Sequence, residues 1–553
     1  MRPWMVFWLA AGLGGGAMGK ALPPLEDAIP PAVKALRAPT DVEFQGGLKM
    51  AVTAANEEAQ TAVNQGLNHL HGGWEFEASR QFAVAMRKDP ECLLAHWGMV
   101  MALLVPTPET GKARNVAAER MLDLLDQGKG SDLERGYVYG LVKYLEDGPV
   151  AAATAFRKVA VKFPNAIQAG VFGALFGRGG YDETGSATPS QQQAEEELAA
   201  LVKAHPESAL PLNALLLIRA EAADLTPSLE LARKLCQMVP DYAPYVHLLG
   251  HYEWRCGEHG AAASAFGRAA VLYDRWMKTN RASLADCPEW VKAENYRVVA
   301  LASQGEFDPA LAAAKHLAAL PLPKARASSA GVRLMLWETA TLPARLLMRR
   351  DQPGDAVLAL AALPKPETLK PYHQECLAYW WIDGLRIALE VQRVLEDGKP
   401  EEARAAVEAL TFHGEQMAKA QGVANSGGER SAWNRSFRTL ELIASEVRGR
   451  LALAGPENLR GTAYNWFRSA VDRQRPAVML YPPVVLSSVW LRLGYFHLLE
   501  NSPDKAIEAF NDALAAFPND MAALQGLQRA QEAAKLPDQA AETALKIKKF
   551  QAP

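Results

Sequence analysis

Residues 487–520 carry a spacing of small, large apolar and proline positions that constrains the fold more than any other feature of the chain. Counted from the first residue of this range, Gly494 stands at the eighth position, Ala506 at the twentieth and Phe510 at the twenty-fourth. Two helices approach closely where small residues face a large ring. Pro518 then closes the second helix. The segment therefore predicts an antiparallel helix pair that buries its apolar face by stacking on further pairs.

The same spacing recurs along the chain. Units starting at Ala59, Leu133 and Ala243 each place a glycine at the eighth position, an alanine at the twentieth and a phenylalanine at the twenty-fourth. A chain of 553 residues is longer than one globular core usually supports, so a repeat array is the expected organisation. We found no segment with the period-two alternation of a sheet. The sequence predicts an all-α solenoid of stacked antiparallel helix pairs that form a curved superhelix.

Breakers and composition divide the chain into five predicted segments. These are a signal peptide (1–21), a proline-rich extended lead-in (22–47), an N-terminal array (48–320), irregular helical repeats with insertions (321–483), and C-terminal units with a capping helix (484–553). Arg2 followed by an apolar run and small residues is typical of a secretory signal, with an uncleaved anchor as the alternative. This signal predicts an exported protein, periplasmic or secreted. Because no later run reaches about 18 apolar residues, we expect no membrane span in the mature chain.

Composition and motifs exclude several function classes. The chain has 59 Lys and Arg against 62 Asp and Glu, without a basic block, which argues against nucleic acid as the partner. No phosphate-binding loop, zinc-protease motif or nucleophile elbow is found, so we expect neither an enzyme nor a cofactor. The five cysteines lack metal spacing and are expected to be buried side chains; if the chain is exported, Cys236 and Cys256 are the first pair to test as a disulfide.

The repeats resemble the tetratricopeptide repeat (TPR) superfamily over roughly residues 59–548. A narrower resemblance links the runs HLHGGWEFEASRQF (69–82), DPECLLAHWGM (89–99) and VPDYAPYVHLLGHYEWRCGEHGAAASAF (239–266) to a group of exported bacterial TPR-array proteins without a settled activity. Glu294 and Asn295 stand where that group has a His-Asn pair. The resemblance implies a TPR fold and export, and it leaves the mechanism open.

The first helix of each TPR unit is expected to line a concave surface with its second, fifth, ninth, twelfth and thirteenth positions. The units at Ala243 and Leu133 place histidine, tryptophan, arginine and tyrosine side chains there, which suits recognition of a peptide. We therefore predict a partner-binding groove formed by His247, His251, Trp254, Arg255, Tyr137 and Tyr144.

His247 and His251 are also the candidate metal ligands. Their spacing of four residues places both imidazoles on one helix face, where they can share a metal ion. The alternative is that both histidines are packing or groove residues, because the pair has no third ligand nearby in sequence. A second cluster, His69 and His71 before Glu75 and Glu77, is interpreted as a helix end rather than a metal site. Three arginines between 345 and 350 are expected on a solvated face.

We interpret the chain as an exported, non-enzymatic TPR scaffold that binds a protein or peptide partner in its groove. A metal- or small-ligand-binding protein that uses the His247 and His251 face is the alternative. A hydrolase without a recognisable motif is a weaker one.

Overall fold

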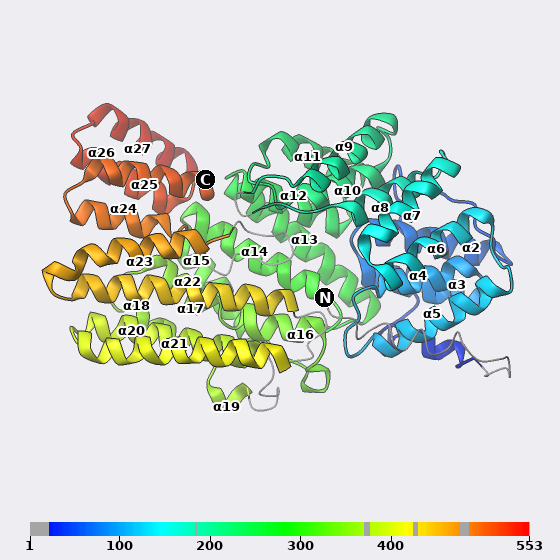
Figure 1. The fold of residues 1–553 in the computed structure, drawn as a ribbon, viewed down its shortest axis with the longest axis horizontal. Helices are drawn as coiled ribbons and strands as arrows, with labels where there is room; N and C mark the ends of the chain where they lie inside the picture. Colours follow the sequence, from blue (N-terminus) through cyan, green and yellow to red (C-terminus); the bar gives the residue numbers. More distant parts are fainter. Residues whose placement is uncertain (1–21, 183–184, 370–376, 424–429, 476–485, 552–553) are drawn as a thin grey trace. The chain divides into compact units, whose positions relative to one another are not determined.

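The computed structural model describes residues 22–182, 185–369, 377–423, 430–475 and 486–551, and these are overwhelmingly helical (Figure 1). Over these residues the only β pairing is an isolated bridge between Tyr181 and Ala187. The predicted signal peptide (1–21) and Cys376 lie outside the described residues. The chain divides into two compact units, Met1–Arg219 with Gln237–Val239, and Ala220–Cys236 with Pro240–Pro553.

The first unit consists of consecutive helices that pack as antiparallel neighbours, such as α2 on α3 and α6 on α7. Its proline-rich start was expected to be extended, yet it contains two short helices, the second with Pro31 at its first position, where a proline costs no hydrogen bond. The elements are η3 (Leu25–Ala28), α1 (Pro31–Ala35), α2 (Glu57–His71), α3 (Glu75–Lys88), α4 (Leu93–Ala102), α5 (Gly111–Asp126), α6 (Asp132–Asp147), α7 (Pro149–Lys162), α8 (Ile167–Gly177), α9 (Pro189–Ala204) and α10 (Ala209–Arg219).

The second unit continues the pattern with helices of more varied length. Its elements are η4 (Thr226–Ser228), α11 (Leu229–Met238), α12 (Ala243–Arg255), α13 (His259–Asn280), α14 (Pro288–Gln304), α15 (Phe307–Ala318), η5 (Lys324–Arg326), α16 (Ala330–Leu334), the π-helical η6 (Met335–Thr339), α17 (Leu342–Arg350), α18 (Asp355–Ala362), α19 (Pro366–Leu369), α20 (Leu377–Glu396), α21 (Pro400–Val423), α22 (Arg430–Ala454), η8 (Glu457–Leu459), α23 (Arg460–Arg473), α24 (Trp490–Leu499), α25 (Pro503–Ala516), α26 (Met521–Ala533) and α27 (Pro537–Gln551).

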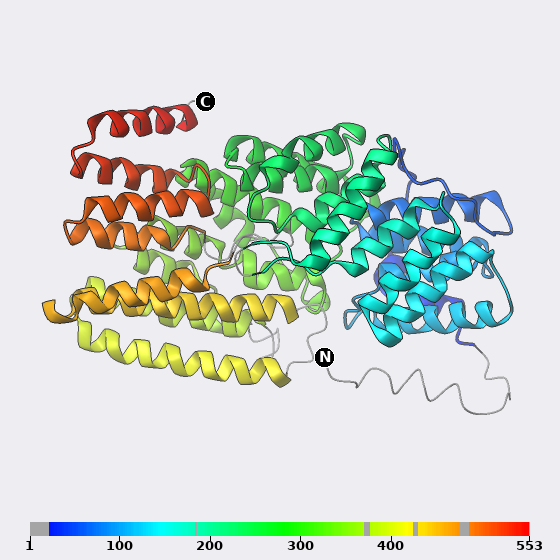
Figure 2. The same cartoon turned by 45° about the horizontal axis from the view of Figure 1, so that its top comes forward.

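A glycine facing a phenylalanine ring closes each of the four clearest helix pairs. A Cβ added to any of these glycines would lie 2.6 to 2.9 Å from the ring, so only glycine permits this approach. The pairs are Gly66 with Phe82, Gly140 with Phe156, Gly250 with Phe266, and Gly494 with Phe510. The predicted all-α fold of paired helices is thus confirmed. Figure 2 shows the last of these pairs continuing into α26 and α27, each helix packed on the next.

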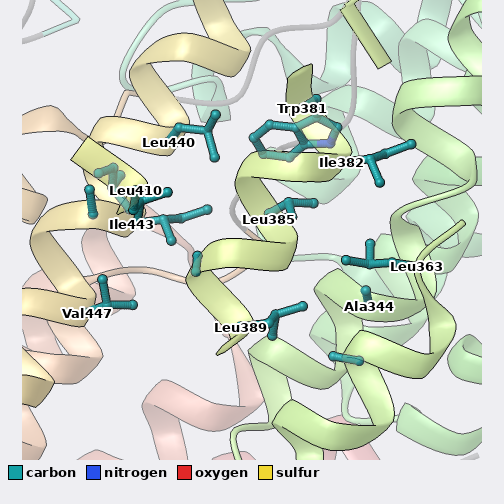
Figure 3. Packing of buried hydrophobic residues seen from close by; sticks show 14 of the residues in the cluster. Ala344, Leu363, Trp381, Ile382, Leu385, Leu389, Leu410, Leu440, Ile443 and Val447 are labelled. Carbon is teal, nitrogen blue, oxygen red and sulfur yellow. The ribbon is translucent and has the colours of Figure 1, made fainter. Parts of the chain in front are cut away.

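The region that fits the repeat spacing poorly contains the two longest helices of the described residues, α21 and α22, which span 24 and 25 residues. Helix α20, with 20 residues, precedes them. Figure 3 shows Trp381 and Leu385 of α20 packed beside Leu440 and Ile443 of α22 in the main core of this unit.

Over the described residues, every helix is too short or too polar to cross a bilayer.

Candidate functional site

His251 lies in the interior of the second unit rather than on an open surface. Its side chain is fully buried on α12, and both ring nitrogens have partners. Nε2 lies 3.0 Å from the carbonyl oxygen of Ala220, and Nδ1 lies 3.3 Å from the hydroxyl of Tyr296. Burial lowers the pKa of His251 to about 3, so the ring is neutral near pH 7.

Tyr296, on α14, is the centre of an aromatic cluster that the sequence reading missed. Its ring stacks on Phe266 at 4.8 Å and meets His247 edge-on at 5.8 Å. Trp254 lies 5.9 Å from the same ring, and its Nε1 donates to Ser303 Oγ at 3.3 Å. These contacts make the cluster a packed seam between α12, α13 and α14.

The predicted groove at α12 is therefore wrong in its geometry. His247, His251 and Trp254 are 8%, 0% and 3% exposed, because α14 packs against the same helix. Arg255 is half-buried, and its guanidinium donates to the carbonyl oxygen of Ala222 at 2.7 Å. These side chains hold helices and turns together, and they present little surface to a partner.

The geometry does not support a metal site at His247 and His251 either. A protein metal site needs three or more ligands with free lone pairs, and both nitrogens of His251 already have partners. Over the part of the chain that the structure describes, no group of three or more His, Cys, Asp or Glu side chains could hold a metal ion. Cys92, Cys236, Cys256 and Cys287 are free thiols, so the Cys236–Cys256 disulfide is not formed.

The two predicted groove tyrosines of the first unit are also packing residues. Tyr137 is 1% exposed; its ring stacks on Trp97 at 5.7 Å, and its carbonyl oxygen accepts from the indole Nε1 at 3.0 Å. Burial raises the pKa of its hydroxyl. Tyr144 is half-buried, with its ring 5.1 Å from that of Phe176. Aromatic packing between repeats accounts for both positions.

The second histidine cluster is part of the interior as well. His71 Nε2 lies 2.8 Å from Gln168 Oε1, and burial lowers the pKa of His71 to about 4. His69 is fully buried, and burial lowers its pKa to about 3. Glu77 pairs with Arg80 at 2.5 Å, and both side chains are buried. His69 and His71 do lie in the last turn of α2, as was expected, but both rings are buried and neutral near pH 7, so they do not act as charges on the helix dipole.

The three arginines of α17 were expected on a solvated face, but two of them, Arg345 and Arg349, have buried side chains. Arg345 is 4% exposed and lies 3.4 Å from Glu338, itself fully buried. Arg349 pairs with Asp520, the residue that caps α26, and both side chains are buried. Charges taken out of water need such partners, so this helix carries an internal ionic network.

A different surface has the features of a polypeptide-binding site. Residues 42–53, the docked segment, contain no helix and run along α2, held by side-chain amides of that helix. The N–H of Leu48 donates to Asn68 Oδ1 at 2.7 Å, and Asn68 Nδ2 donates to the Leu48 carbonyl at 2.9 Å. Asn64 makes the same pair of bonds with Met50, at 2.8 and 3.0 Å. Each asparagine thus hydrogen-bonds to both the main-chain N–H and the main-chain carbonyl of one residue.

Two glutamines extend this set. Gln65 accepts from the N–H of Val42 at 3.1 Å and donates to its carbonyl at 3.0 Å. Gln60 Oε1 accepts from the N–H of Val52 at 3.4 Å. We call Gln60, Asn64, Gln65 and Asn68 the amide ladder.

The ladder matches the repeat of an extended chain. Along α2 the residues Gln60, Asn64 and Asn68 oppose Val52, Met50 and Leu48 in turn. Four helical residues rise about 6 Å, and two extended residues span about 6.6 Å. An amide side chain placed every four residues along α2 therefore lies opposite every second residue of the docked segment. The docked segment runs antiparallel to α2.

Side chains of the docked segment alternate between covered and exposed. The covered ones are Val42, Phe44, Leu48, Met50 and Val52, and the exposed ones include Glu43, Lys49 and Thr53. The Phe44 ring meets His69 edge-on at 5.2 Å, and His69 in turn lies 6.0 Å from Trp74. The segment thus buries one apolar edge, as an extended peptide does on a binding surface.

Further side chains hold the main chain beyond the ladder. Glu134, the capping residue of α6, accepts the N–H of Thr53 at 2.7 Å with one carboxylate oxygen and that of Ser131 at 2.5 Å with the other. Further contacts lie just outside the docked segment: Asp89 accepts from the N–H of Ala55, Gln81 donates to the carbonyl of Thr40, and Arg80 donates to that of Arg37. The site therefore combines α2 with the start of α6 and side chains of α3.

The ladder was missed because two signals were read separately. The short alternation of Leu48, Met50 and Val52 was overlooked, although the expectation that no segment forms a sheet holds over the described residues. The amides at 60, 64 and 68 lie on one helix face, where polar residues ordinarily meet solvent. Side-chain amides repeated every four residues beside a short alternating run are the signal that identifies such a site.

Comparisons with known proteins bear on the family. Residues 487–532 match the tetratricopeptide repeat family model. No curated protein matches the chain.

Solved structures with similar helical arrays align over most of the chain at low identity. The yeast Tom70 structure covers 90% of this chain and 93% of its own, at 11% identity and a TM-score of 0.26. The alignment with a human IFIT1 dimer with m7Gppp-AAAA covers 91% of this chain and 96% of that one, at 11% identity and a TM-score of 0.37. The alignment with the APC/C hetero-tetramer Cut9-Hcn1 covers 85% of this chain and 90% of that one, at 12% identity and a TM-score of 0.28. At these scores the alignments carry no inference about function.

The family match covers the segment whose spacing is clearest, and the same glycine-to-phenylalanine seam closes three further helix pairs. Residues 487–532 are thus similar to a tetratricopeptide repeat.

Proposed function

We propose that the protein is an exported, non-enzymatic scaffold that binds an extended segment of a partner protein. Repeat arrays of helix pairs present broad surfaces on which partners dock. The observation that carries the proposal is the amide ladder, which holds three residues of polypeptide by both their N–H and their carbonyl groups. A surface that satisfies main-chain groups in pairs is suited to bind other extended chains.

A peptide-display selection tests the scaffold. Random peptides are selected against the full chain and against a variant in which the docked segment is released, Gly46→Val. We expect enriched peptides to carry apolar residues at alternate positions and to lose binding when Asn64→Ala and Asn68→Ala are combined. Thr61→Ala, an exposed position on the same helix, is the matched control and should retain binding. Selections on both proteins that yield no peptide dependent on the two asparagines would contradict the proposal.

Export is the second part of the proposal, and it is supported by the sequence of residues 1–21. A tagged full chain expressed in a Gram-negative bacterium should appear in the periplasmic fraction. Its new N-terminus should follow Gly19 or Ala21, where small residues prepare a cleavage site. A cytoplasmic chain that keeps its first residues would remove export from the proposal and leave the scaffold.

A further inference from the structure

We infer that the docked segment is an intramolecular stand-in for the partner, and that the partner is an extended, proline-free segment with apolar side chains at alternate positions. The inference rests on the proposed function and adds the class of ligand and the competition that controls access. Its basis is the chemistry of the contacts that residues 42–53 make with the amide ladder.

The ladder selects conformation more than sequence. Asn64 and Asn68 bind the N–H and carbonyl of Met50 and Leu48, which every residue except proline can offer. Both asparagine amides also donate to the helix carbonyl four residues earlier, at 3.2 and 2.9 Å. Those bonds fix the side-chain orientation before any ligand arrives. A partner therefore needs an extended main chain without proline at the two bidentate positions.

Covered side chains add specificity. Leu48, Met50 and Val52 lie on the covered side, while Lys49 and Thr53 face solvent. An incoming segment needs apolar residues at three alternate positions and is free at the positions between them. A ring at the place of Phe44 would meet His69, which is neutral because burial lowers its pKa to about 3. The site thus fits an extended peptide whose covered side chains are apolar and uncharged.

The segment is held by contacts that an incoming peptide can replace one for one. The ladder hydrogen bonds are side chain to main chain at partly buried positions, where water competes and each bond contributes modestly. Because the segment is part of the same chain, its effective concentration is about millimolar, and a partner must outcompete it. Intramolecular occupancy lowers the apparent affinity by the fraction of time the site is free.

Gly46 offers a single position at which to release the segment. Its φ of +66° lies in the left-handed region, and a Cβ added there would lie 1.9 Å from the carbonyl oxygen of Glu207. Its own carbonyl accepts the N–H of Ala209 at 3.2 Å. Gly46→Val should therefore displace the turn and free the residues that follow. Gly111→Ala is the matched control, because the nearest atom to its added Cβ is 4.0 Å away.

The test is binding of a fluorescein-labelled peptide with the sequence of residues 40–55 to full-length proteins, followed by anisotropy. We expect Gly46→Val to bind the peptide at least about tenfold more tightly than the wild type or Gly111→Ala. Adding Asn64→Ala and Asn68→Ala to Gly46→Val should abolish the gain, whereas adding Thr61→Ala should not. A peptide N-methylated at the residues matching Leu48 and Met50 should not bind, because both donors are lost.

Hydrogen–deuterium exchange of residues 42–53 verifies the release, and Phe44→Ala is a second release variant if Gly46→Val does not fold. Equal peptide binding by the wild type and the released variant would show that the docked segment does not compete with a partner. The proposed scaffold function would still stand. Binding that survives the asparagine substitutions or N-methylation would overturn the ladder as the site. No peptide binding despite verified release would overturn the inference, and the display selection then decides the proposed function separately.

Discussion

Asn64 and Met50 exchange two hydrogen bonds, one from the Met50 N–H to Asn64 Oδ1 at 2.8 Å and one from Asn64 Nδ2 to the Met50 carbonyl at 3.0 Å. Asn64 lies on a helix and Met50 on an extended segment outside any strand, so these bonds are not part of regular secondary structure. An asparagine side chain carries one acceptor and two donors, and the third group here donates to the carbonyl of Gln60 at 3.2 Å. Asn64 is thus fully matched to the main chain it contacts.

Replacing Asn64 with alanine should expose the docked segment to exchange while the helices stay folded. Both bonds to Met50 are lost at a partly buried site, and each contributes about 1 kcal/mol. Deuterium uptake of residues 48–52 should increase, with α2 and α3 unchanged. Asn64→Asp should behave similarly, because a carboxylate accepts from the N–H but cannot donate to the carbonyl. Unchanged uptake in both variants would show that the segment is held by its apolar edge alone.

The glycine-to-phenylalanine seam predicts opposite effects for two glycine substitutions in the second unit. Gly494→Ala places a Cβ 2.6 Å from the Phe510 ring and should lower the stability of α24 and α25 by about 1–3 kcal/mol. Gly461→Ala, where an added Cβ meets nothing within 4 Å, should be neutral or stabilise by up to about 1 kcal/mol. Urea unfolding and exchange rates measure both. A tolerated Gly494→Ala would mean that the seam is looser than the structure places it.

The buried pair of Glu338 and Arg345 should be more costly to break than to remove. Burial raises the pKa of Glu338 and lowers that of Arg345, so desolvation outweighs their mutual attraction. Arg345→Met removes the guanidinium that donates to Glu338 and leaves the buried carboxyl without this partner, so it should destabilise the second unit by about 3–5 kcal/mol. Combining it with Glu338→Gln should restore part of that loss. The melting temperatures of the single and double variants decide this, and additive losses would contradict it.

How much the sequence reveals depends on whether an interaction is local. Gly494 and Phe510 lie on consecutive helices, so their spacing alone predicted a contact that the structure confirms. The inner face of α12 was read from the same register, yet His251 is covered by Tyr296 from a later helix, and no spacing within the unit specifies that neighbour. The docked segment presents the same difficulty. Asn64 and Met50 meet because an irregular stretch folds back, and only its brief alternation marks it beforehand.

Acid should destabilise the second unit through its buried histidines. The pKa of His247 is lowered to about 3 by burial, with Lys292 acting in the same direction, against about 6.5 when unfolded. The unfolded state therefore binds the proton first, so stability is full above about pH 6.5 and falls as pH drops toward 3. One such histidine lowers the free energy of unfolding by about 2–3 kcal/mol at about pH 4.5. His247→Leu should reduce the difference in urea midpoint between about pH 7.5 and pH 4.5. An unchanged difference would show that other groups set the acid response.

Trp254→Ala should act on folding rather than directly on a partner. The indole is 3% exposed, packs on Tyr296 and donates to Ser303, so truncation leaves a cavity and an unpaired hydroxyl. The expected loss is about 3–5 kcal/mol in the second unit. Arg255→Ala alone should cost less, because the side chain is half-buried and its guanidinium donates to carbonyl oxygens of a turn. Thermal unfolding decides whether this face of α12 is a binding surface or a packed seam. A Trp254→Ala protein that melts like the wild type but loses a partner would restore α12 as a binding surface, whereas a clear drop in melting temperature identifies it as a packed seam.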